Sequence, residues 1–192
     1  MLLDEPFANL DARLRAEVRD DTLALLAAQG AATLMVTHDP GEALRMADRL
    51  AIMRNGRIEQ SGPPDEVFAA PANRFCAEFL SEYSILPGQC EEGRDVVAGP
   101  FRLPGRDLSP QQPVDVLICP EALCFRAGAG DARVEVVRIR DLGPMILVDA
   151  RVTPDGPLLR GHWGEGRRPH AGEQVSASLV TEKVFVFPRE TP

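Results

Sequence analysis

The sequence of 192 residues contains no run of about 18 apolar residues, the length that a membrane-spanning helix requires. A basic segment ahead of an apolar stretch, typical of a secretory signal, is also missing, because Asp4 comes almost at once. Basic residues are fewer than acidic ones: 21 against 29, which gives a net charge of −8. This charge argues against duplex DNA and other polyanions as partners. We expect no nucleic-acid partner and a cytoplasmic protein, or one bound peripherally to a membrane.

Cysteine is present at four positions only, and no C-x-x-C pair occurs among them. The spacing of Cys119 and Cys124 does not fit a zinc knuckle. Buried, reduced thiols are therefore the expectation for Cys76, Cys90 and these two residues.

Two apolar runs near the N-terminus each stop at side chains that can do chemistry. Met1-Leu2-Leu3, which is typical of the tail of a buried strand, ends at Asp4 and Glu5, and the run 33–37 ends at His38. Between the runs, apolar residues at helical spacing predict a helix closed by Gly30. Such a strand–helix–strand unit has parallel strands, whose ends share one rim of the sheet. In open α/β sheets that rim binds ligands.

A helix is predicted from position 40 to about 47, with Asp39 as its N-cap and Glu42 at the acidic position of a capping box. The dipeptide Asn55-Gly56 predicts a tight hairpin between strands 49–53 and 57–60. Two short helices are expected next, near 64–69 and 73–82, with apolar anchors at Phe68, Phe75, Phe79 and Leu80.

Beyond position 84 only strand-like runs are apparent, at 114–118, 133–139, 145–152, 175–180 and 184–187. Many of the 16 glycines and 17 prolines lie in this part, so short strands with frequent turns are expected. The predicted fold class is an α/β unit with a partial parallel sheet, followed by an all-β barrel or sandwich. We place the boundary within 82–88, which divides the chain into 1–83 and 84–192. Gly161-His162-Trp163-Gly164 is expected to be a turn with one core aromatic, or a ligand-stacking element in a barrel mouth.

The dyad Asp4-Glu5 suits phosphoryl transfer. One carboxylate can hold Mg²⁺, directly or through water, while the other orients an attacking water. His38 could donate to a γ-phosphate, or it could be a satisfied polar group at the edge of the cleft. Asp11 could cap the helix that starts beside it, or it could reach across to another subunit.

These segments resemble a known family. Residues 2–11, Leu-Leu-Asp-Glu-Pro-Phe-Ala-Asn-Leu-Asp, resemble the Walker B segment and D-loop of an ABC-transporter ATPase, and Val36-Thr37-His38-Asp39 resembles its H-loop. The hairpin that begins at Asn55 fits the segment that follows in that family. Residues 84–192 resemble the transport-associated OB-type regulatory domain of importer ATPases. There Pro120-Glu121 falls where such domains often read Arg-Pro-Glu, with Cys119 in place of the arginine.

The resemblance implies a role for each site residue. Asp4 would bind Mg²⁺ through water, Glu5 would polarise the attacking water, His38 would contact the γ-phosphate of ATP and Asp11 would signal across a dimer. By the resemblance Asp4, His38 and Asp11 are the residues of the ATP and Mg²⁺ site. It also implies that two such ATPase subunits pair, drive transmembrane permease subunits and lie at the inner face of the cell membrane. The solute, whether a polyamine, ferric iron, sulfate or a sugar, stays open.

The sequence departs from the family at the phosphate site. It contains no G-x-x-x-x-G-K-[ST] loop, no signature motif and no glutamine loop, and its single lysine is Lys183. One hypothesis is therefore the C-terminal part of an importer ATPase, which alone binds ATP weakly or not at all. A second is a non-catalytic regulatory module derived from such a subunit. A third, a metal hydrolase using Asp4, Glu5, His38 and Asp39, would need further ligands nearby.

Overall fold

The structure is a computed structural model that describes residues 1–92, 95–105, 108–128, 130–164 and 166–189. The chain forms two compact units, Met1–Leu80 and Ser81–Pro192. We describe each unit by itself. Their assignment to part of an ATPase domain (1–83) and to a regulatory domain (84–192) stays a prediction.

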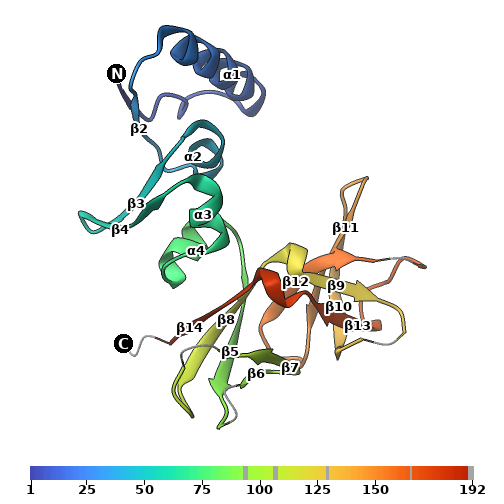
Figure 1. The fold of residues 1–192 in the computed structure, drawn as a ribbon. Coiled ribbons are helices and arrows are strands. Elements are labelled where there is room, and N and C mark those ends of the chain that lie inside the picture. The colour runs from blue at the N-terminus through green and yellow to red at the C-terminus, as the bar shows by residue number, and fades with distance from the viewer. Residues whose placement is uncertain (93–94, 106–107, 129, 165, 190–192) are drawn as a thin grey trace. The chain divides into compact units, whose positions relative to one another are not determined.

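The first unit begins with a strand–helix–strand motif, as the sequence predicts. Strands β1 (Leu2–Asp4) and β2 (Leu34–Val36) pair in parallel, with Leu2 opposite Leu34 and Asp4 opposite Val36. Helix α1 (Ala12–Gln29) connects them (Figure 1) and ends at Gly30 in the left-handed conformation that a C-cap glycine adopts.

The two parallel strands are not buried, contrary to the expectation for the first apolar run. Leu2 is 69% exposed and Leu34 is 65% exposed, while Leu3 is half-buried. On α1, Leu14 and Leu25 of the predicted apolar face are exposed as well. The physical reason is that β1 and β2 form a sheet of two strands among the described residues, which is too narrow to enclose a core.

The second half of this unit confirms the predicted hairpin. Helix α2 (Pro40–Met46) is followed by antiparallel strands β3 (Leu50–Arg54) and β4 (Arg57–Gly62). Their two-residue turn, Asn55-Gly56, has positive φ at both positions, +51° and +76°, as this tight turn requires.

Helices α3 (Pro64–Ala69) and α4 (Arg74–Leu80) follow the hairpin. They share a small core with it, built from Leu50, Ile52, Val67, Cys76 and Leu80. The expectation that Phe68 anchors this core is wrong, because its side chain is 40% exposed. Its neighbour Val67 lies on the inner face of α3 instead, with 1% exposed.

The second unit is built from β-strands, and their order confirms an all-β region with a closed barrel. The barrel strands, in the order of the ring, are β10 (Ala132–Asp141), β11 (Ile146–Arg151), β12 (Leu158–Trp163), β9 (Leu123–Arg126) and β13 (Gln174–Leu179). Strands β12 and β9 pair in parallel, while the other neighbours are antiparallel. A five-stranded barrel is compatible with an OB-like fold.

A five-stranded sheet accompanies the barrel. Its strands, from one edge to the other, are β14 (Val184–Pro188), β8 (Pro113–Ile118), β5 (Ser84–Cys90), β6 (Asp95–Ala98) and β7 (Phe101–Pro104). Two short 3₁₀ helices, Pro120–Ala122 and Thr181–Lys183, lie between β8 and β9 and between β13 and β14.

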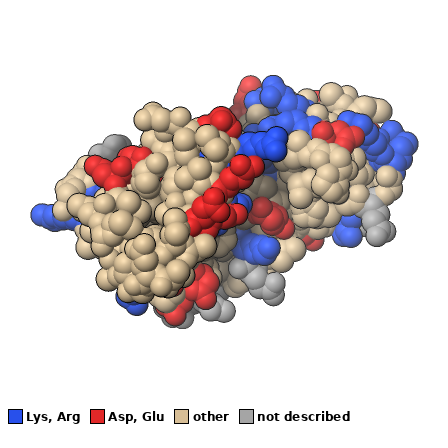
Figure 2. Space-filling view, turned by 90° about the horizontal axis from the view of Figure 1, so that it is seen from above, with Lys and Arg blue, Asp and Glu red and all other residues tan. Residues whose placement is uncertain are grey.

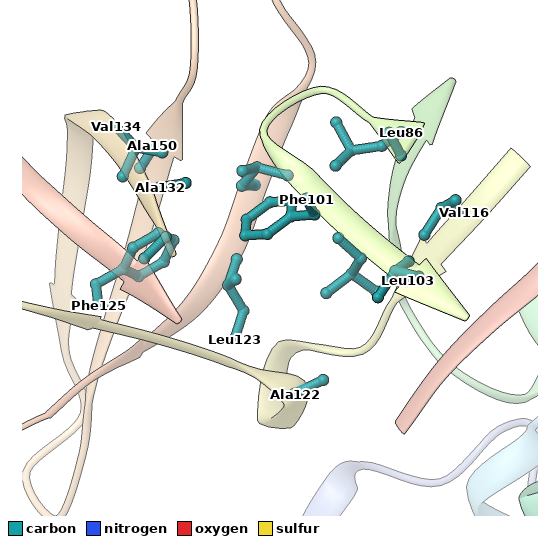
Figure 3. Close-up of a cluster of buried hydrophobic side chains, with 14 of the residues drawn as sticks. Leu86, Phe101, Leu103, Val116, Ala122, Leu123, Phe125, Ala132, Val134 and Ala150 are labelled. Carbon is teal, nitrogen blue, oxygen red and sulfur yellow. The ribbon is translucent and has the colours of Figure 1, made fainter. Parts of the chain in front are cut away.

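One hydrophobic core serves both the barrel and this sheet. Phe125, Val134 and Ala150 come from the barrel and Leu86 and Phe101 from the sheet, and all five are nearly or fully buried. Figure 3 shows side chains of the two sets facing one another, with Phe101 between them. The two β-structures therefore form a single folded unit.

Trp163 corrects the expectation of a turn at 161–164. It belongs to β12, where its ring is 8% exposed and joins the core. Cys76, Cys90 and Cys119 are buried free thiols, as expected, and Cys124 is half-buried. Among the helices of the described residues, none combines the length and the apolar character needed to cross a bilayer.

Candidate functional site

The ends of β1 and β2 bring Glu5 and His38 into direct contact. The Nδ1 atom of His38 lies 2.7 Å from Oε1 of Glu5, although 33 positions separate the two residues. Each follows the last residue of its strand by one or two positions, so the parallel pairing places both at the same edge. The sequence predicted this juxtaposition of an acid and an imidazole.

The contact favours the charged form of the histidine. The pKa of His38 is raised, first by the hydrogen bond with Glu5 and second by the negative charge of that carboxylate. Asp39 and Glu42 add smaller effects in the same direction. The imidazole is 78% exposed and the carboxylate 35%, so the pair lies open to solvent and to a ligand.

The backbone of Glu5 has an unusual conformation. Its φ is +46°, in the left-handed region that residues other than glycine seldom adopt. Its N–H donates to the carbonyl of Val36 at 2.9 Å, and its own carbonyl accepts from the N–H of Ala8. Strained conformations of this kind are found at functional sites, where they aim a side chain. Here the turn directs the carboxylate of Glu5 toward His38.

Asp4 lies at the same edge of the sheet. It is the last residue of β1, pairs with Val36 and is exposed. Its carboxylate offers the oxygen ligands that Mg²⁺ prefers. The described residues contain no group of three or more His, Cys, Asp or Glu side chains placed to hold a metal ion. The third hypothesis, a metal hydrolase built from Asp4, Glu5, His38 and Asp39, stays untested.

Asp11 and Asp39 are both helix N-caps. The carboxylate of Asp11 accepts from the N–H groups of Arg13 and Leu14 at 3.1 and 3.0 Å, at the start of α1. Asp39 accepts from Gly41 at 2.8 Å, at the start of α2. The cap predicted at Asp39 is confirmed, and for Asp11 the structure shows the capping alternative. The role of Asp11 across a dimer stays a prediction.

Behind the site, Thr37 and Glu42 form a contact that sequence reasoning missed. Glu42 is 4% exposed and accepts a hydrogen bond from the Thr37 hydroxyl at 2.7 Å. That hydroxyl in turn accepts from the N–H of Asp39 at 3.1 Å. The predicted capping box is therefore completed indirectly through Thr37, which fixes the residue before His38. No sequence signal pointed to it, because a separation of five positions matches neither the helical spacing nor that of a capping box.

Comparison with known proteins gives no matching family model but many similar proteins. A sulfate/thiosulfate import ATP-binding protein of Chromobacterium violaceum is 38% identical over 202 aligned residues, which cover 99% of this chain and 55% of that protein. The chain belongs to the family of ABC importer ATP-binding subunits. Other members of the family include an Fe(3+) ions import ATP-binding protein of Pseudomonas fluorescens, 43% identical over 68% of this chain and 37% of that protein.

A spermidine/putrescine import ATP-binding protein of Pseudomonas aeruginosa is 36% identical over 65% of this chain and 34% of its own length. The chain spans about half the length of the curated relatives it matches, or less. The match covers their C-terminal portions. The names of these relatives give three different solutes, so the relatives belong to one family but are not named for one transported substance.

Proposed function

We propose that this chain is the C-terminal part of the ATP-hydrolysing subunit of an ABC importer, which couples hydrolysis of Mg-ATP to solute uptake. The observation that carries the proposal is the contact of Glu5 with His38 at the shared edge of β1 and β2. The membership of the family supports it, because the relatives are named as import ATP-binding proteins. The partial parallel sheet of β1 and β2 would belong to an NTPase-type domain.

We assign the roles by geometry and chemistry. Glu5 is the group that orients the attacking water, since its carboxylate is held at the site by its backbone turn and is partly open to solvent. His38 is the hydrogen-bond donor for the γ-phosphate, and its raised pKa keeps it able to donate. Asp4 is the residue that would bind Mg²⁺ through its hydration shell, because it adds an exposed carboxylate at the same edge.

The site is incomplete on the phosphate side. The sequence contains no glycine-rich phosphate loop, and its single lysine, Lys183, belongs to the second unit. Backbone amides and a lysine normally anchor the β- and γ-phosphates. We therefore propose that the isolated chain binds Mg-ATP weakly or not at all, and that the cradle lies in the part of the relatives outside the match.

The partners follow from the same assignment. We propose a second ATPase subunit, toward which Asp11 would signal, and transmembrane permease subunits at the cytoplasmic face of the membrane. We propose that the second unit, Ser81–Pro192, which we call the barrel unit, is the transport-associated OB-like regulatory domain. Its closed five-stranded ring supports this reading.

A chimera tests the proposal. The portion of the Chromobacterium violaceum relative outside the match would be joined to this chain, and phosphate release from ATP would be measured with and without Mg²⁺. We expect Mg-dependent hydrolysis that falls about 100-fold or more in Glu5→Gln and in His38→Ala. Glu17→Gln, an exposed acid on α1, is the matched control and should leave the rate unchanged. A rate in Glu5→Gln equal to that of the parent chimera would contradict the assignment.

One observation favours a second candidate, a non-catalytic regulatory or ligand-sensing module. The missing phosphate loop removes the nucleotide anchor while the barrel unit retains a large core. Under this alternative the chimera would bind nucleotide through the donated portion but would not respond to substitutions at Glu5 or His38. The same experiment therefore separates the two candidates.

A further inference from the structure

The second unit contains a pocket of about 210 Å³ beside the first strand of its sheet. Glu82, Tyr83, Asp149 and Arg160 contribute the ionisable groups of its lining, and Ser84 a hydroxyl. Pro120 and Leu158 complete the wall. The volume is several times the about 30 Å³ that a water molecule takes up in the liquid, so a small polyatomic ligand fits.

Hydrogen bonds with Asp149 and Ser84 fix the position of Arg160. Its Nε donates to Oδ1 of Asp149 at 2.9 Å, and Arg140 donates to Oδ2 of the same carboxylate at 2.7 Å. Asp149 is 5% exposed, so its two oxygens are engaged inside the unit. The backbone N–H of Arg160 also donates to the Ser84 hydroxyl at 2.8 Å. The guanidinium groups of Arg140 and Arg160 thus share the single negative charge of Asp149. One of the two positive charges therefore needs a further anionic partner.

Glu82 is that partner, through a weak contact. Its carboxylate accepts from Nη1 of Arg160, but the side chain of Glu82 is 82% exposed. An ion pair this open to water contributes little stability, because solvent screens it and its flexible side chain loses entropy in forming it. The guanidinium group of Arg160 is therefore held in place by Asp149, while the carboxylate of Glu82 on its outer side can be displaced by another anion.

We propose that this pocket is a binding site for a small oxyanion, such as a sulfate, a phosphate or the carboxylate group of a metabolite, which displaces Glu82 from Arg160. A planar guanidinium fork held in position recognises such groups through paired N–H donors. The site lies in the barrel unit and uses none of the residues assigned to ATP hydrolysis.

The remaining groups of the pocket suit an anion. Burial first, and then the charges that Cys119 and Glu121 carry at the alkaline pH where the phenol titrates, raise the pKa of Tyr83 to about 12. The phenol therefore stays protonated at neutral pH and can donate a hydrogen bond. The Ser84 hydroxyl accepts from the backbone of Arg160 and keeps its own proton to donate. The carboxylate of Asp149 faces the pocket as well, but its charge is shared between the two arginines.

The sequence offers a site-specific probe for the test. Tyr83 is the single tyrosine of the chain, so biosynthetic labelling with 3-fluorotyrosine gives one ¹⁹F resonance that reports on this pocket. The labelled 192-residue chain would be titrated with sodium sulfate, sodium phosphate and sodium acetate, each against sodium chloride at equal ionic strength. We expect a saturable shift with at least one oxyanion that chloride does not produce. Identical shifts with the oxyanions and with chloride would overturn the proposal. The comparison of sulfate and phosphate with acetate identifies the kind of oxyanion that the site accepts.

Three variants locate the site. Glu82→Gln removes the competing carboxylate and should tighten binding about two- to fivefold, the range that corresponds to an exposed ion pair. Arg160→Gln should abolish the saturable shift. Arg133→Gln, an exposed arginine on β10 outside the pocket, is the control and should leave the affinity unchanged. Equal affinity in Glu82→Gln and the parent chain would contradict the displacement of Glu82, and retained binding in Arg160→Gln would contradict the site.

Arg160→Gln could impair folding because Asp149 would lose a partner. The near-ultraviolet circular dichroism of Trp163, the single tryptophan, reports on the barrel core in each variant. If Arg160→Gln does not fold, Arg160→Lys replaces it, since lysine keeps the charge but has no planar fork. We expect at least tenfold weaker binding in Arg160→Lys, and undiminished binding would overturn the proposal.

Discussion

His38 and Glu5 meet at 2.7 Å through the parallel register of two strands of three residues each. On the face shown in Figure 2, acidic and basic side chains are interspersed with uncharged surface. The Glu5–His38 contact is set by the pairing of β1 with β2 and by the turn at Glu5. The groups that raise the pKa of His38 are its neighbours Glu5, Asp39 and Glu42.

The first prediction concerns the titration of His38. Its pKa should lie above the ordinary value of about 6.5, because the hydrogen bond and then the charge of Glu5 favour the imidazolium. Any stability that the pair contributes is present below the unfolded-state pKa and is lost as pH rises through the raised folded-state value. Proton NMR of the histidine C2–H resonances measures the pKa. In Glu5→Gln it should fall, and an unchanged value would show that the contact does not persist in solution.

The second prediction concerns local stability. Limited proteolysis should cut the chain within residues 1–80 before it cuts within 90–189. The reason is that β1, β2 and α1 leave large apolar side chains exposed, including Leu2 and Leu34, whereas the second unit has a continuous core. Mass spectrometry of the early products identifies the cut sites. Equal resistance of the two halves would count against a loosely held first unit.

The third prediction concerns Gly161 in the barrel. A Cβ atom at this position would lie 2.2 Å from the carbonyl oxygen of Leu123, a clash with backbone that a side-chain rotation cannot relieve. Gly161→Ala should therefore lower the free energy of unfolding by about 3 kcal/mol, the upper end for overpacking. Gly99→Ala is the control, because its φ of +57° is strained for alanine while the space around it is open. It should cost about 1 kcal/mol. Denaturant unfolding followed by Trp163 fluorescence measures both, and equal losses would contradict the close approach.

The fourth prediction concerns acid stability. Burial alone would raise the pKa of Asp149, but hydrogen bonds from Arg160 and Arg140 outweigh it and lower the pKa below its usual value. The stability from this group is therefore present above an unfolded-state pKa of about 3.9 and is lost as pH falls through the lower folded-state value. Asp149→Asn should destabilise the barrel unit by about 1.5 to 3 kcal/mol at pH 7, because the two arginines left behind are partly solvated, and it should weaken the loss of stability below pH 4.

Asp141→Asn serves as the control for Asp149. Asp141 also pairs with an arginine, Arg168 at 2.9 Å, but both side chains are about half exposed. Thermal unfolding at a series of pH values measures both variants. A similar small effect of the two substitutions would show that burial does not distinguish these ion pairs.

The first unit was largely predictable because its signals are local. The caps of α1 at Asp11 and Gly30 and the Asn55-Gly56 turn encode their structures directly. The apposition of Glu5 and His38 followed from the rule that parallel strands end on one side of a sheet. Burial was not predictable, because it depends on which strands lie next to β1 and β2, and the apolar pattern of a strand does not say whether a neighbour is present.

Five strands of the second unit escaped prediction, β5, β6, β7, β9 and β12. Gly161 and Gly164 around Trp163 suggested a turn, whereas Gly161 permits the close parallel approach of β12 to β9. Pro87-Gly88 also lies inside β5. A Cβ atom added to Gly88 would lie 2.9 Å from the carbonyl oxygen of Val97 on the neighbouring strand, so this position also needs a glycine. Glycine marks both turns and close strand contacts, and a single sequence does not separate the two.

The site in the barrel unit was also beyond sequence reasoning. Glu82 lies far from Asp149 and Arg160 in the chain, and each of the three alone is an ordinary charged residue. Their meeting depends on the pairing of β11 with β12 and on the path of the segment before β5. Non-local contacts of this kind follow from the fold and not from a motif.

The central claim is that Asp4, Glu5 and His38 form the hydrolytic side of a nucleotide site whose phosphate cradle lies outside this chain. The most direct measurement is a calorimetric titration of Mg-ATP into the isolated 192-residue chain and, in parallel, into the chimera. We predict no saturable heat from the chain up to millimolar nucleotide and clear binding by the chimera. Micromolar affinity of the isolated chain for Mg-ATP would contradict the claim.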